Sequence, residues 1–126
     1  MKYFLLLLFV GLQISCTEIR IGDTIARKIA KSSTIGKGQN NLCLPFAYAL
    51  HNKFEQARIK SKVVCYHWQH TTDNKNGDHA IVIFDDQGRT YVMDNQSFEP
   101  TWVKTSTELD IAQQFSGVFN QVIPYH

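Results

Sequence analysis

Three residue types that act together in thiol enzymes follow one another along the chain: Cys43, His79 and Asp94. A thiol is a good nucleophile only once it ionises, and a neighbouring histidine can take up its proton. A carboxylate behind the histidine fixes the tautomer of the ring and stabilises its charged form. We therefore expect Cys43 to be the nucleophile, His79 the general base and Asp94 the acid that orients the base.

The position of Cys43 is set by a predicted helix over residues 42–57, whose apolar residues recur at helical spacing. Asn40 or Asn41 is the expected N-cap. Cys43 then lies in the first turn, where unpaired N–H groups and the helix dipole favour a thiolate. The same N–H groups can bind the oxyanion of a tetrahedral intermediate.

His79 and Asp94 are expected on paired strands. Residues 80–84 form a continuous apolar run, residues 89–94 are the returning strand, and a polar turn joins them. A turn centred between residues 86 and 87 places His79 opposite Asp94, with the carboxylate on Nδ1 of the ring. A three-residue loop with a bulge shifts the pairing by one and places Asn95 opposite His79 instead. Asparagine can orient a histidine too, so Asn95 is the alternative third residue.

The remaining elements complete an α+β fold. We expect a helix over residues 24–31 capped by Asp23, a strand over residues 59–68 and a last helix over residues 106–115. Both Thr105 with Glu108 and Thr107 with Asp110 have capping-box spacing at the start of the last helix. The predicted architecture is therefore N-terminal helices packed on a small antiparallel sheet.

Three short segments carry a family resemblance: 40–47 (Asn-Asn-Leu-Cys-Leu-Pro-Phe-Ala), 77–82 (Gly-Asp-His-Ala-Ile-Val) and 88–94 (Gly-Arg-Thr-Tyr-Val-Met-Asp). In their order and spacing they resemble the papain-like superfamily, most closely its bacterial transglutaminase-like cysteine peptidases. The resemblance implies a helix on a small antiparallel sheet, with Cys43, His79 and Asp94 as nucleophile, base and orienting acid. This chain has Asn-Leu-Cys where many members have Gly-Asp-Cys, and Gln39 is a weaker candidate for an oxyanion donor.

The N-terminus has the pattern of an export signal. A basic start is followed by an apolar run over residues 3–12, which has the length of a signal-peptide core and is too short to span a bilayer. We expect residues 1–15 to be removed and residues 17–126 to form a single domain in the periplasm, in the cell envelope or outside the cell. Ile-Ser-Cys at residues 14–16 resembles a lipobox, so a lipid anchor at Cys16 and plain secretion both stay open.

Two other interpretations of these residues are a non-catalytic module held by a disulfide and a metal site. In an oxidising compartment Cys43 and Cys65 could form a disulfide, which would suit a non-catalytic envelope binding module of the same fold. His67, His70, His79 and Cys65 do not complete a familiar zinc pattern, so we expect neither metal nor cofactor. The net charge of +2 gives no argument for nucleic acid. The expected partner is a peptide, protein or peptidoglycan stem-peptide substrate.

Overall fold

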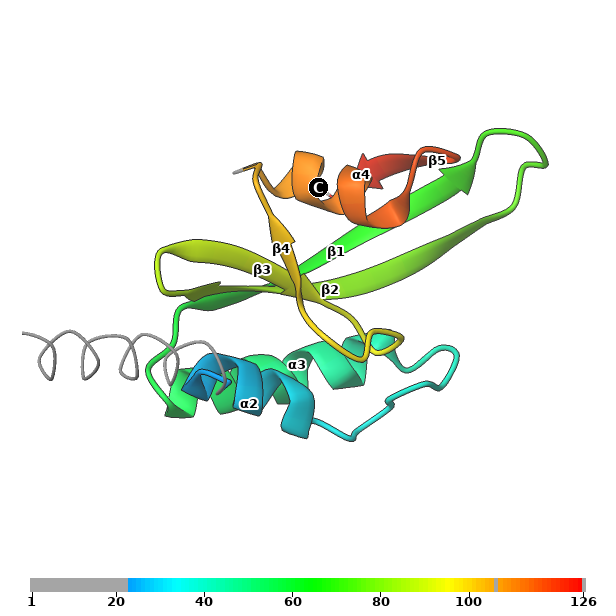
Figure 1. Ribbon diagram of the computed structural model, residues 1–126. Helices are drawn as coiled ribbons and strands as arrows, with labels where there is room; N and C mark the ends of the chain where they lie inside the picture. The colour runs from blue at the N-terminus through cyan, green and yellow to red at the C-terminus, as the bar shows by residue number, and fades with distance from the viewer. Residues whose placement is uncertain (1–22, 106, 126) are drawn as a thin grey trace, which may run out of the picture.

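The computed structural model of the chain describes residues 23–105 and 107–125 (Figure 1). The predicted export segment at 1–15 and the predicted lipidation site at Cys16 lie outside the described residues. Among the helices in the described part, none is long and apolar enough to cross a membrane.

The described residues form an α+β domain with three helices and a five-stranded antiparallel sheet, as the sequence predicts at this coarse level. The helices are α2 (Ile25–Ser32), α3 (Cys43–Gln56) and α4 (Glu108–Ser116). The strands are β1 (Ser61–His70), β2 (Asn76–Asp86), β3 (Arg89–Met93), β4 (Thr101–Val103) and β5 (Asn120–Pro124). Their order in the sheet is β4-β3-β2-β1-β5, and every neighbouring pair is antiparallel.

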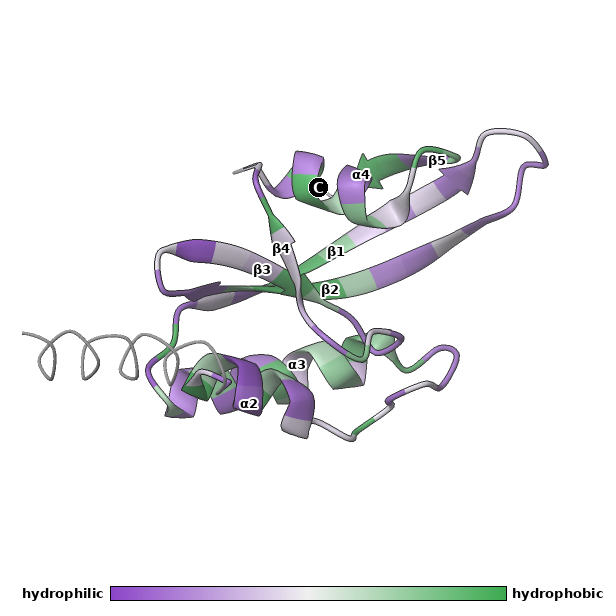
Figure 2. Ribbon diagram, viewed as in Figure 1, coloured by the Kyte–Doolittle hydropathy of each residue, from purple (hydrophilic) through white to green (hydrophobic). Residues whose placement is uncertain are grey.

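The sheet separates two layers of helices. Helices α2 and α3 cover one face and α4 covers the other (Figure 1), and apolar colouring is prominent in the middle of the sheet, between these helices (Figure 2). Side chains alternate along β2, so that Ala80 packs in the cluster under α3 and Ile81 in the cluster under α4. The α3 cluster contains stacked aromatic rings, among them Phe54 and Phe84 with centroids 4.5 Å apart. Each face of the sheet therefore has its own core.

The bounds of the helices were predicted more accurately than their capping residues. Helix α3 begins at Cys43, in the predicted first turn, but its N-cap is Leu42, which makes no side-chain capping bond. The predicted caps Asn40 and Asn41 are therefore wrong. Helix α2 is capped by the Thr24 hydroxyl instead of Asp23.

The cap of α4 follows one of the two predicted spacings. The Thr107 hydroxyl accepts a hydrogen bond from the Asp110 N–H at 3.2 Å. Such a side-chain acceptor satisfies one of the N–H groups that a helix start leaves unpaired. The helix begins at Glu108, two residues later than predicted.

The β2–β3 hairpin has a register that neither prediction gave. Val82 pairs with Met93 and Asp86 with Arg89, which leaves a two-residue loop of Gln87 and Gly88. Both loop residues have positive φ, 52° and 76°, as a tight hairpin turn that matches the strand twist requires. The predicted direct pairing of His79 with Asp94, and its shifted alternative, are therefore both wrong.

Candidate active site

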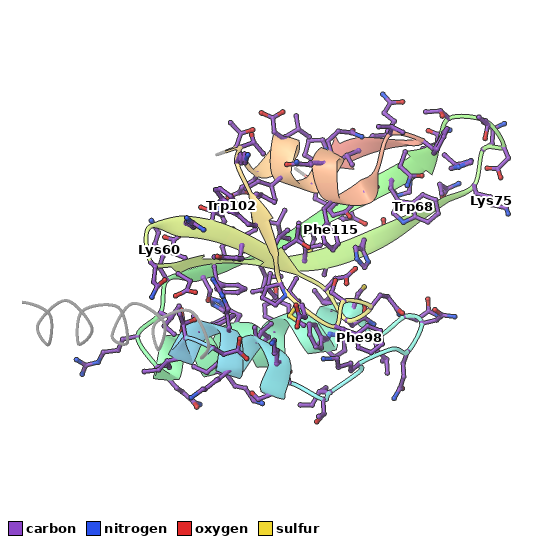
Figure 3. The ribbon with its side chains drawn as sticks, in the orientation of Figure 1. Lys60, Trp68, Lys75, Phe98, Trp102 and Phe115 are labelled. Atoms are coloured by element: carbon purple, nitrogen blue, oxygen red, sulfur yellow. The ribbon has the colours of Figure 1, made fainter. Side chains whose placement is uncertain are left out.

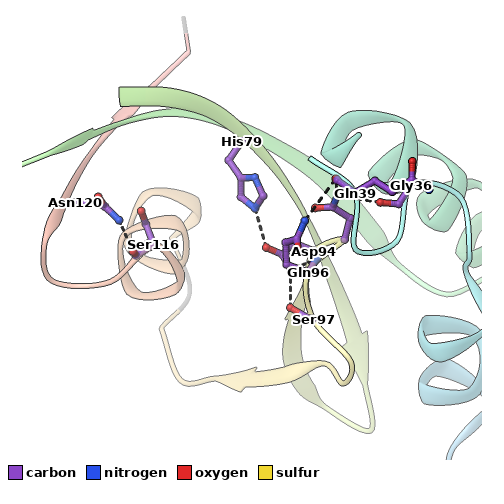
Figure 4. A network of polar contacts seen from close by, with 9 residues as sticks. Gly36, Gln39, His79, Asp94, Gln96, Ser97, Ser116 and Asn120 are labelled. Carbon is purple, nitrogen blue, oxygen red and sulfur yellow. Dashed lines mark hydrogen bonds and ion pairs between the residues drawn. The ribbon is translucent and has the colours of Figure 1, made fainter. Parts of the chain in front are cut away.

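His79 and Asp94 are in contact although they are not cross-strand partners. His79 Nε2 lies 2.8 Å from Asp94 Oδ2 (Figure 4). The β2–β3 ladder ends where Val82 pairs with Met93, so Asp94 is the first residue after β3 and its side chain can turn toward the ring. The imidazole keeps 20% of its side-chain surface exposed and the carboxylate 9%. The pair is thus shielded, yet open to a ligand on one side.

The second carboxylate oxygen of Asp94, Oδ1, is held by two further hydrogen bonds. Asp94 Oδ1 accepts hydrogen bonds from the Ser97 hydroxyl at 2.6 Å and from the Gln96 N–H at 3.0 Å. Burial opposes ionisation of this carboxyl. The hydrogen bonds from His79, Ser97 and Gln96, with the charge of His79, outweigh it and hold the pKa of Asp94 below its ordinary value. Asp94 is therefore an ionised acceptor at neutral pH.

This contact determines which ring nitrogen is available for chemistry. An ionised carboxylate only accepts hydrogen bonds, so the Nε2 of a neutral His79 ring must carry the proton. Nδ1 then has a free lone pair, and no hydrogen bond from another described residue occupies it. The predicted contact of the carboxylate with Nδ1 is therefore wrong, because Asp94 meets Nε2 instead. Proton transfer by His79 would therefore run through Nδ1.

Asn95, the predicted alternative to Asp94, has another role. It is 2% exposed, and its Nδ2 donates to the carbonyl oxygens of Gly36 and Gln39 at 3.1 and 2.7 Å. Its own carbonyl accepts from the Gly38 N–H at 2.7 Å. Asn95 therefore ties the end of β3 to the loop that leads into α3, and it joins the neighbourhood of Asp94 to that of Cys43.

Cys43 occupies the first position of α3 and packs, half-buried, against the cluster under that helix. His79 lines a pocket on the opposite, α4 side of the sheet, and no hydrogen bond joins the Cys43 thiol to its ring among the described residues. The structure therefore assembles the base and the acid but leaves the thiol on the other face of the sheet. Cys43 and Cys65 are both free thiols, without the disulfide of the alternative reading. Burial raises the pKa of Cys65, and the charge of Cys43 adds to the rise.

A pocket of about 230 Å³ opens beside the His79–Asp94 pair on the α4 side of the sheet. Tyr66 lies against His79 in an edge-on arrangement, with ring centroids 5.8 Å apart. Burial raises the pKa of Tyr66 to about 12. The Ser116 side chain works in the opposite direction, and the charges of Asp94 and Cys43 add to the rise. Tyr66 is therefore a neutral wall of this pocket at neutral pH.

The residues that support the His79–Asp94 pair were not predicted from the sequence. Ser97 follows Asp94 by three residues, and short polar side chains at this spacing in a turn often form a hydrogen bond. The Asp94–Ser97 contact could therefore have been predicted from the sequence. Tyr66 and Ser116 come from β1 and α4, and only the fold brings them to His79. Gln39 contributes its carbonyl to Asn95, and no hydrogen bond of its side chain is present among the described residues.

The histidines weighed as metal ligands have carboxylate partners instead. His67 Nδ1 lies 2.8 Å from Asp78 Oδ1, and His70 Nδ1 lies 2.7 Å from Asp73 Oδ1. In the described part of the chain, no group of three or more histidine, cysteine, aspartate or glutamate side chains is arranged to hold a metal ion.

No family model matches the chain, and no curated protein or solved structure is significantly similar to it. The resemblance to papain-like enzymes therefore remains a prediction from three short segments.

Proposed function

We propose that the protein is an exported cysteine hydrolase or acyltransferase of papain-like, transglutaminase-like type, acting on an amide bond. The observation that carries the proposal is the His79–Asp94 hydrogen bond of 2.8 Å, made through Nε2 by an ionised carboxylate. It leaves Nδ1 as a base with a fixed tautomer. Cys43 at the start of α3 is the nucleophile in this proposal. Because Cys43 packs on the α3 face of the sheet and His79 on the α4 face, the proposed reaction requires the start of α3, which Asn95 ties to the end of β3, to move until Sγ reaches the ring.

The reaction would proceed in two stages. His79 Nδ1 takes the thiol proton as Cys43 Sγ attacks the amide carbonyl, and the tetrahedral intermediate collapses to a thioester while Nδ1 returns the proton to the leaving amine. Water or a second amine then attacks the thioester, with His79 again taking the proton. Leu42 offers no side-chain acceptor to the first N–H groups of α3, so these can hold the oxyanion.

The acceptor in the second stage decides the product. Water gives a peptidase or amidase, and an amine gives a transglutaminase. The apolar N-terminal segment supports export to the envelope or beyond, with or without a lipid on Cys16. A peptide, a protein or a peptidoglycan stem peptide is the substrate class that fits this location. A non-catalytic binding module held by a Cys43–Cys65 disulfide has less support, because both thiols are free.

The test compares the two thiols within the full chain. We expect iodoacetamide to label Cys43 faster than Cys65 at pH 7, because burial raises the pKa of Cys65. Peptide-resolved mass spectrometry separates the two sites from each other and from Cys16. In parallel, a fluorogenic peptide library should be cleaved by the Cys65→Ser variant and not by Cys43→Ser. Equal labelling of both thiols, or turnover that survives Cys43→Ser, would overturn the proposal.

A further inference from the structure

The edge strand β4 carries an indole ring that two cations share. Trp102 lies on β4 and is 46% exposed (Figure 3). The guanidinium carbon of Arg89 lies 4.5 Å from the centre of the ring, and Lys104 Nζ lies 5.0 Å from it. Both cations are themselves exposed, so a ligand can reach them from solvent.

The register of the sheet places the two cations next to each other. Thr90 pairs with Val103, so continuing the β3–β4 ladder by one residue places Arg89 opposite Lys104. Directly opposed residues share a face of the sheet, and like charges at such positions are unfavourable. The Trp102 ring offsets part of this cost, because the face of an indole attracts a cation that lies over it. The ring therefore holds two repelling charges at one place.

No carboxylate of the described residues forms an ion pair with Arg89 or Lys104. Two acidic side chains that lie near Trp102 are paired with a different cation, since Lys31 Nζ lies 3.0 Å from Asp23 Oδ2 and 3.2 Å from Glu99 Oε1. Two positive charges thus stay without a counter-charge from the described part of the chain.

A small pocket adjoins the indole ring, between α2 and the β3–β4 edge of the sheet. Its volume is about 290 Å³, and its walls include Trp102, Tyr91 and Pro100. The Tyr91 hydroxyl accepts a hydrogen bond from Arg27 Nη2 at 2.8 Å, which fixes one wall of the pocket to α2. A pocket of this size suits a small molecule better than a segment of a chain.

We propose that Arg89 and Lys104, held on the Trp102 ring, bind an anionic oxygen group, the phosphate or carboxylate of a small ligand whose remaining part enters the adjoining pocket. An anion bound to both cations relieves their mutual repulsion. The planar guanidinium of Arg89 can donate to two oxygens of such a group. The site uses none of the proposed catalytic residues, so it does not depend on the proposed function.

Titration with simple anions tests the site directly. The protein is the full chain with Trp68→Phe, which leaves Trp102 as the single tryptophan. At an ionic strength kept constant with sodium chloride, we expect sodium phosphate, sodium acetate or both to change the Trp102 fluorescence saturably. A response to phosphate alone identifies a phosphate ligand, and a response to acetate alone identifies a carboxylate ligand. Calorimetric titration of the unsubstituted chain gives the same measurement if Trp68→Phe does not fold.

Substitutions separate this site from the general charge of the surface. Arg89→Gln and Lys104→Gln should each raise the Kd of the bound anion at least about threefold, because each removes a charged donor. Lys75→Gln removes the same charge from the tip of the β1–β2 hairpin, far from Trp102 (Figure 3), and should leave the Kd unchanged.

The role of the ring is tested by Trp102→Leu, followed by calorimetry. This substitution should weaken anion binding although it removes no charge, because both cations lose the surface that holds them. Three results would overturn the site: no saturable response by either method, equal effects of Lys75→Gln and Arg89→Gln, or binding that Trp102→Leu leaves unchanged.

Discussion

His79 Nε2 and Asp94 Oδ2 are 2.8 Å apart, yet continuing the β2–β3 register would place Gln96, not Asp94, opposite His79. The contact forms because the chain leaves the ladder after Met93 and turns, with Ser97 and the Gln96 N–H holding the second carboxylate oxygen. A direct cross-strand pair would be fixed by the sheet itself. Here the position of the acid depends on the turn, so residues that shape the turn should affect the reactivity of the base.

Replacing the base should separate a functional His–Asp pair from a structural one. In the proposed enzyme, His79→Gln should lower peptide cleavage by at least about 10²-fold, because the positioned general base is lost. The chain offers a matched control in His67, which also lies 2.8 Å from an aspartate, Asp78, on the same two strands. His67→Gln should leave cleavage within about twofold of wild type. Similar losses in both variants would point to a general effect of disturbing the hairpin.

Asp94 should make the stability of the protein depend on pH in acid. Its folded pKa lies below the ordinary value of 3.8, so its ionised form favours the folded state at neutral pH. That contribution is full above pH 3.8 and is lost as the pH falls below this value toward the folded pKa. Urea unfolding from pH 5 to pH 2.5 should therefore show the difference between wild type and Asp94→Asn shrinking with acidity. A difference that stays constant over this range would contradict the assignment.

Asn95 should matter for stability through its side-chain amide. Asn95→Ala leaves the carbonyls of Gly36 and Gln39 without this donor, so we expect the free energy of unfolding to fall by about 2–4 kcal/mol. Asn95→Asp should be destabilising as well, because a carboxylate cannot donate to either carbonyl. The exposed neighbour Gln96→Ala should cost less than about 0.5 kcal/mol in the same urea titration.

The sequence was most informative where a pattern repeats over many residues. The helix over residues 42–57 was predicted from its apolar periodicity, and α3 spans Cys43–Gln56, one residue shorter at each end, with Cys43 in its first turn. The strands β4 and β5 were not predicted, because three and five residues carry too little periodicity to distinguish them from loop. The hairpin register was missed because Gln87, a residue that rarely adopts positive φ, occupies the first position of the turn.

The candidate site, too, was predicted only in part. Cys43, His79 and Asp94 were chosen by type and order, and the structure brings the last two into contact. Which nitrogen meets the carboxylate depends on the turn after Met93, which sequence spacing does not encode. The pocket residues Trp68, Phe115 and Asn120 come from three separate elements, so only the assembled sheet shows that they line the pocket beside His79.

Two glycines in the loop before α3 give a paired test of how that loop positions Cys43. Gly36 and Gly38 have similar φ values, +71° and +73°, so an alanine at either should cost about 1 kcal/mol in backbone strain. A Cβ at Gly36 would also lie 2.7 Å from the Leu42 carbonyl oxygen, whereas a Cβ at Gly38 meets nothing within 4 Å. Gly36→Ala must therefore displace the N-cap of α3, and should cost roughly 3 kcal/mol in urea unfolding. It should also slow iodoacetamide labelling of Cys43, while Gly38→Ala leaves that rate unchanged. Equal costs and equal labelling rates in the two variants would show that the loop does not position the thiol.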